Sequence, residues 1–177
     1  ARNLLAEEAF LTLSGEANQL FAEDLAGALQ ANLDGGSLEA RGVAGRVRLS
    51  GRRAADIQLT ELGDSLTVDV GDGSFARVSR VEGPVEATVN GSELTGENVN
   101  DVQVRGRDAV VSLSDVAGSM DVEMVASLFD ARTSSRSSPK LSFTGESEAR
   151  VGVPTPSRVK LADGAGPGES PPGLSAG

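Results

Sequence analysis

Apolar residues recur at two periods over residues 84–122, and this feature constrains the fold more than any other. Within a segment they alternate with polar residues, as in Pro84-Val-Glu-Ala-Thr-Val-Asn-Gly91, and the alternation restarts about every nine residues. A period of two is typical of a strand with one buried face. The pattern therefore predicts one short strand per nine residues, repeated along the chain.

The longer period is clearest from residue 37 onward, where each segment opens with an apolar residue. These leading residues lie eight to ten positions apart: Leu38, Val47, Ile57, Leu66, Phe75, Val85, Leu94, Val102, Val111 and Met120. Every second segment carries a further apolar residue: Val43, Leu62, Val81, Val99 and Val116. Odd and even segments therefore differ, and the full repeat is about 18–19 residues with two unlike strands and two turns.

Such a repeat favours an all-β fold, a β-solenoid of the parallel β-helix type. Coils stacked in register bury one strand face continuously and pair the backbone groups of successive coils. We expect one inward column of Leu38, Ile57, Phe75, Leu94 and Val111, and an opposite column of Val47, Leu66, Val85, Val102 and Met120. Hairpins of a β-sandwich are the alternative, although they give no reason for odd and even segments to differ.

Two segments depart from the alternation. In Phe75-Ala-Arg-Val78 the second apolar residue comes three positions after the first, which predicts a β-bulge. Leu94 is followed two positions later by Gly96, where an apolar residue is expected. We interpret both departures as local distortions of one wall.

The chain is long enough for one domain with its own core. We expect a single solenoid domain over residues 1–162, with a cap or first coils at 1–36, regular coils at 37–128, and a loop and closing strands at 129–162. Residues 14–36 also fit an amphipathic helix, but the continued period favours strands. Residues 163–177 are mostly Gly, Pro and Ser, which predicts a flexible tail.

Composition narrows the classes of function. The sequence contains no His and no Cys, so it lacks the commonest general base, the commonest metal ligand and thiolate chemistry. We expect a protein that is not an enzyme, with no catalytic residues, no cofactor and no metal. The formal net charge of −10 argues against nucleic acid and anionic membranes as partners. With no long apolar run and no leader at Ala1, we also expect no membrane insertion.

Two acidic motifs are candidate sites. Asp69-Val-Gly-Asp-Gly73 is similar to the calcium-binding turns of toxin-type solenoids, but those sites need the motif in successive coils and it occurs once. Glu93 and Glu97 are a carboxylate pair of the kind that hydrolyses glycosides. The short corners leave no loops to wall a cleft, so we interpret both motifs as solvated surface.

Charge is unevenly distributed along the sequence. Five arginines lie between residues 41 and 53, whereas residues 61–101 carry nine acids and two arginines. The candidate binding patch consists of Arg41, Arg46, Arg48, Arg52 and Arg53. It suits an anionic surface glycan, a protein, or self-association with a second copy. The alternative is two solvated faces with compensating charge.

Residues 37–125 resemble a known family. The segments Val85-Glu-Ala-Thr-Val-Asn-Gly91, Val102-Gln-Val104 and Val111-Ser-Leu-Ser-Asp-Val-Ala-Gly-Ser-Met-Asp-Val122 resemble the bacterial adhesin β-strand repeat family, relatives of the head-GIN adhesin domains. The resemblance implies a β-solenoid that is extracytoplasmic or at the cell surface, without established catalytic residues. In this chain, Arg52-Arg53 replaces the apolar and Gly residues that such repeats have at that point.

Three functions follow as hypotheses. The first is a non-enzymatic cell-surface or envelope β-solenoid that acts as a scaffold or adhesion-type binding module. The second is a self-assembling structural subunit that stacks end to end. The third is a carbohydrate-active solenoid enzyme.

Overall fold

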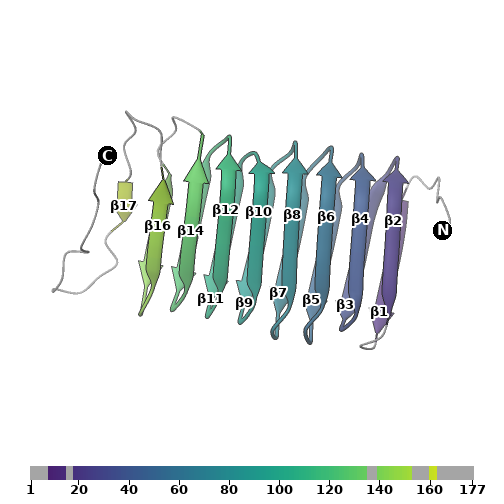
Figure 1. Ribbon diagram of the computed structural model, residues 1–177, viewed down its shortest axis with the longest axis horizontal. Helices are drawn as coiled ribbons and strands as arrows, with labels where there is room; N and C mark the ends of the chain where they lie inside the picture. Colours follow the sequence, from purple (N-terminus) through teal and green to yellow (C-terminus); the bar gives the residue numbers. More distant parts are fainter. Residues whose placement is uncertain (1–7, 15–17, 135–138, 153–159, 163–177) are drawn as a thin grey trace.

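The computed structural model describes residues 8–14, 18–134, 139–152 and 160–162, and their regular structure is entirely β. The strands alternate between two parallel sheets that lie face to face along the length of the molecule (Figure 1). The protein is therefore a β-solenoid, as the repeat predicts. Among these residues no helix is long and apolar enough to cross a membrane.

Sheet A contains the nine odd-numbered strands and sheet B the eight even-numbered strands of the described chain. Sheet A consists of β1 (Glu8–Ser14), β3 (Ala28–Asp34), β5 (Val47–Arg52), β7 (Leu66–Gly71), β9 (Val85–Asn90), β11 (Val102–Arg107), β13 (Met120–Val125), β15 (Lys140–Thr144) and β17 (Lys160–Ala162). Sheet B consists of β2 (Gln19–Leu25), β4 (Ser37–Val43), β6 (Asp56–Leu62), β8 (Phe75–Val81), β10 (Glu93–Val99), β12 (Val110–Val116), β14 (Leu128–Thr133) and β16 (Glu148–Gly152).

Strands lie within residues 19–34, where the sequence also fits a helix, and within residues 140–152, where the repeat is irregular. β2 and β3 lie within residues 14–36, so the strand interpretation of that stretch is confirmed over the positions described. β15 and β16 lie within residues 129–162, where a loop and closing strands are predicted. Residues 163–177, the predicted tail, lie outside the described residues.

Corner length explains why the repeat is uneven. From β4 to β13, even strands have seven residues and odd strands six. Both corners between β4 and β6 have three residues, and the register partners Leu38 and Ile57 lie 19 positions apart. Both corners between β10 and β12 have two residues, and Leu94 and Val111 lie 17 positions apart. The strands are constant, and the corners absorb every change in length.

The even strands from β2 to β12 differ from the odd strands because of a kink near their ends. Asp24, Gly42, Glu61, Arg80, Asn98 and Asp115 all have positive φ, between 52° and 66°. Each directly precedes the extra apolar residue of its segment, for example Val43 after Gly42. Strict alternation would turn that residue outward, since it lies five positions after the leading residue. The left-handed residue resets the alternation, so Val43 and its counterparts point into the core and are buried.

The inward columns match the prediction except at one position. On sheet A, Val47, Leu66, Val85, Val102 and Met120 are successive register partners and all are buried. On sheet B, Ile57 and Leu94 both pair with Ala76, not with Phe75. Phe75 faces outward between Asp56 and Glu93 and is 51% exposed. The placement of Phe75 in the column was wrong, although the column itself exists.

The predicted bulge at Phe75 was wrong for the same reason. Ala76 and Val78 are the inward residues of β8, two positions apart, and pairing with β6 and β10 is continuous. At Gly96, the other departure, the Leu113 side chain of the next coil occupies the space of the missing side chain. A Cβ on Gly96 would lie 2.7 Å from it. A small residue in one coil and a large one in the next keep the core filled.

Candidate binding surface

The five arginines of the predicted patch lie on different parts of the solenoid. Arg41 faces outward from sheet B, where its Nε lies 2.9 Å from Glu61 Oε2. Arg53 lies at a corner and ion-pairs with Asp34. Arg46 and Arg48 line one groove on sheet A. The structure thus brings together Arg46 and Arg48, while Arg41 is on the opposite sheet.

Glu61, the residue at the kink of β6, forms ion pairs with both Arg41 and Arg80. Its other oxygen, Oε1, accepts a hydrogen bond from Arg80 Nη2 at 3.0 Å. The hydrogen bond from Arg41 is the main reason that the pKa of Glu61 lies below its usual value. The cluster is exposed and pairs one carboxylate with two guanidinium groups, so each arginine has an ion-pair partner while the cluster keeps a net positive charge.

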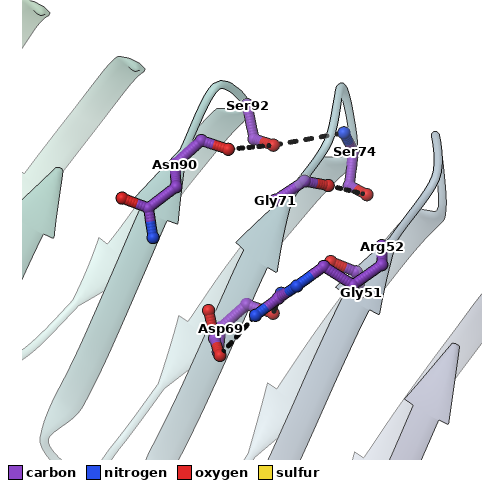
Figure 2. A network of polar contacts seen from close by, with 7 residues as sticks. All are labelled: Gly51, Arg52, Asp69, Gly71, Ser74, Asn90 and Ser92. Atoms are coloured by element: carbon purple, nitrogen blue, oxygen red, sulfur yellow. Dashed lines mark hydrogen bonds and ion pairs between the residues drawn. The ribbon is translucent and has the colours of Figure 1, made fainter. Parts of the chain in front are cut away.

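Arg52 forms an ion pair with Asp69, the first aspartate of the motif Asp69-Val-Gly-Asp-Gly73 (Figure 2). Its Nη2 donates to Asp69 Oδ2 at 2.7 Å, and its Nη1 donates to the carbonyl oxygens of Gly51 and Asp69. A Cβ at Gly71 would lie 3.3 Å from Arg52 Cδ, so the glycine leaves space for this side chain. The described residues contain no group of three or more His, Cys, Asp or Glu suited to a metal ion.

Serine side chains form a ladder inside the corners that lead from sheet A to sheet B. The Ser74 hydroxyl accepts a hydrogen bond from the Ala55 amide. The Ser92 hydroxyl accepts one from the Ser74 amide (Figure 2). Each hydroxyl also donates within its own corner, Ser74 to Gly71 O and Ser92 to Asn90 O. The ladder satisfies backbone amides where two sheets part, and its role is therefore structural.

Ala109 interrupts this ladder, which leads to a testable prediction. The Ser127 hydroxyl accepts from the Ala109 amide, but Ala109 supplies no hydroxyl to the amide of Ser92 in the preceding coil. Ala109→Ser should restore that bond and raise the free energy of unfolding by about 0.5–1 kcal/mol, measured by urea denaturation. Ala109→Val is the control. A serine variant no more stable than the valine variant would contradict the ladder.

A shallow groove crosses sheet A from β5 to β13, and each of these five strands and the corner before it present one side chain each to the groove. The strand row consists of Arg48, Thr67, Glu86, Gln103 and Asp121, which are successive register partners. The corner row lies two positions earlier in each coil and consists of Arg46, Ser65, Pro84, Asp101 and Ser119. Positive charge thus lies at the β5 end, and carboxylates lie from β9 to β13.

Asp101 is fixed within the corner row. Its Oδ1 accepts hydrogen bonds from the Ser119 amide at 2.7 Å and from the Ser119 hydroxyl at 2.6 Å. The hydroxyl bond and then the amide bond hold the pKa of Asp101 below its ordinary value of 3.8. The carboxylate is therefore ionised and oriented at neutral pH.

This hydrogen-bonded carboxylate predicts a pH effect. A lowered pKa in the folded state means that the ionised group adds stability above the ordinary pKa of 3.8, and that this stability is lost as pH falls through the lower folded value. Asp101→Asn should change stability at pH 7 by less than about 1 kcal/mol and flatten the loss of stability below about pH 4. Thermal unfolding between pH 2 and 7 measures both, and an unchanged acid slope would contradict the assignment.

Glu93 and Glu97, the carboxylate pair considered for catalysis, lie on the single strand β10. Four residues along an extended strand place them about 13 Å apart. Paired carboxylates of glycoside hydrolases stand roughly 5–9.5 Å apart. The arrangement weighs against a joint role for these two residues.

Together, the fold and the surface define a two-sheet parallel β-solenoid with a grooved outer face. Protein-family models, curated proteins and solved structures were compared with the chain, and none of them matches it. Sequence reasoning found Arg46 and Arg48 but missed the other residues of the groove. The repeat could have indicated the other groove residues, because side chains 17–19 positions apart, such as those of Arg48 and Thr67, are neighbours on sheet A.

Proposed function

We propose that the protein is a non-enzymatic β-solenoid of the cell surface or envelope that acts as a scaffold or adhesion-type binding module. The main support is the form of its corners. Between β4 and β13 every corner has two or three residues, so no long loop walls either sheet over this part of the chain. Enclosed reaction sites generally need such walls, whereas broad faces with rows of polar side chains suit attachment to an extended partner.

The location is proposed from the resemblance of residues 37–125 to adhesin repeats. Fractionation of the source cells, followed by detection with an antibody, tests the location. Recovery in the cytoplasmic fraction alone would overturn this part of the proposal.

Binding is tested with the purified chain and washed cell envelopes. The expected result is retention on envelopes without release of reducing sugar from a panel of polysaccharides. Sugar release that Glu93→Gln or Glu97→Gln abolishes would favour the enzyme hypothesis instead. Filaments seen by electron microscopy, with an elution volume that falls as concentration rises, would favour end-to-end stacking.

A further inference from the structure

The groove on sheet A has hydrogen-bonding groups that the fold itself does not use. The side chains of Arg48, Thr67, Gln103 and Asp121 make no hydrogen bond or ion pair with another described residue. They stand on four different strands but in one register row. An unfilled row of donors and acceptors is what a polar ligand lying along the solenoid axis requires.

The charges of the groove restrict that ligand. Arg46 and Arg48 stand together at the β5 end, and Arg46 is oriented by its hydrogen bond to the Ser65 hydroxyl at 3.3 Å. Asp101 and Asp121 stand at the other end, where Asp101 is held ionised. A carboxylate is therefore favoured over β5 and repelled over β11 and β13. These charges disfavour a chain with an acid on every unit, and a mostly uncharged chain with one acidic end fits them.

The spacing of the groove favours a glycan over a peptide. Neighbouring strands lie about 4.8 Å apart, so β5 and β13 are separated by about 19 Å. A β-linked glycan advances by about one strand spacing per sugar, which lets successive hydroxyl groups meet successive strands. An extended peptide has its affinity mainly from backbone pairing at a sheet edge, and the strands under the groove are paired on both sides.

We infer that the groove across β5, β7, β9, β11 and β13 binds a linear β-linked oligosaccharide, uncharged along most of its length, whose terminal uronic acid lies over Arg46 and Arg48. The inference rests on the proposed binding function and names its ligand class. Thr67 and Gln103 contact sugar hydroxyls, and Asp121 accepts hydrogen bonds from them. The lining residues include no aromatic ring to stack on a sugar, so binding is weak and calls for a method suited to weak complexes.

The test is a titration of the purified full chain followed by NMR. Four probes are used: a neutral β-linked glucan pentasaccharide, the same pentasaccharide with one terminal uronic acid, a polyuronate, and a basic peptide. The terminal uronic acid probe is expected to bind best, the neutral probe next, and the polyuronate least. Tighter binding of the basic peptide or of the polyuronate would overturn the inference.

Matched variants locate the site. Arg48→Gln should weaken binding of the uronic acid probe about tenfold and that of the neutral probe less than about twofold. Gln103→Leu should weaken both. Arg77→Gln and Gln58→Leu are the controls on sheet B, because both residues face outward there with no described partner. Equal losses in the controls, or no binding of any oligosaccharide, would overturn the inference.

Retention on envelopes separates this inference from the proposed function. If retention persists in Arg48→Gln and Gln103→Leu, the glycan groove is wrong while the binding function stands. If wild-type retention is absent as well, the proposed function fails with it. All four variants lie on outward faces, so their thermal midpoints should match the wild type, which excludes unfolding as the cause of any loss.

Discussion

Val102→Asp is expected to lower the free energy of unfolding by about 3–5 kcal/mol. Val102 is 3% exposed and pairs with Val85 and Met120 in the inward column of sheet A. An aspartate there faces an apolar interior and finds no partner for its charge or its hydrogen bonds. Urea denaturation followed by circular dichroism measures the loss.

The neighbouring outward position provides the control. Gln103→Thr should change stability by less than about 0.5 kcal/mol, because Gln103 faces solvent. Aspartate is a poorer choice there, since Glu86 and Asp121 are the direct register neighbours and like charges across strands repel. Similar losses at positions 102 and 103 would show that the alternation is assigned to the wrong face.

Gly83→Ala is expected to cost about 2–3 kcal/mol. Gly83 lies in a corner that stacks on the equivalent corner of the previous coil. A Cβ on Gly83 would lie 2.6 Å from the carbonyl carbon of Asp64 and 2.7 Å from the Ser65 nitrogen. Both atoms belong to the backbone, so the clash is relieved only if two coils move apart. Denaturation of the variant by urea tests the effect.

A second glycine separates steric crowding from backbone strain. Gly73 has φ +74° and nothing within 4 Å of its built Cβ. Gly73→Ala should therefore cost only the strain of a left-handed alanine, about 1 kcal/mol. A larger effect at Gly73 than at Gly83 would mean that corner stacking is less tight than the structure shows.

The architecture was predictable because burial is periodic and the period is local. Val47, Leu66 and Val85 occupy equivalent positions whatever the exact corner, so the solenoid and its two unlike strands follow from the sequence. Phe75 shows the limit of that reasoning. Its large apolar side chain suggests burial, but the face is set by the alternation of Ala76 and Val78, and the ring stays in solvent.

The groove was not predictable residue by residue because it depends on register. Corners of two and of three residues both occur, so register partners lie 17 to 19 positions apart and one fixed period does not identify them. Placing Gln103 beside Glu86 needs the knowledge that the intervening corners have two residues each. Compensation between coils, as between Gly96 and Leu113, is likewise visible only once the coils are stacked.

Because the strands keep their lengths while the corners vary, the solenoid can lengthen by whole coils. Duplicating one full coil, with its two strands and two corners, would extend both sheets by one spacing and leave each remaining neighbour pair as it was. The polar row on sheet A would grow by the same step. The length of the solenoid and the length of its gene therefore change together in fixed increments.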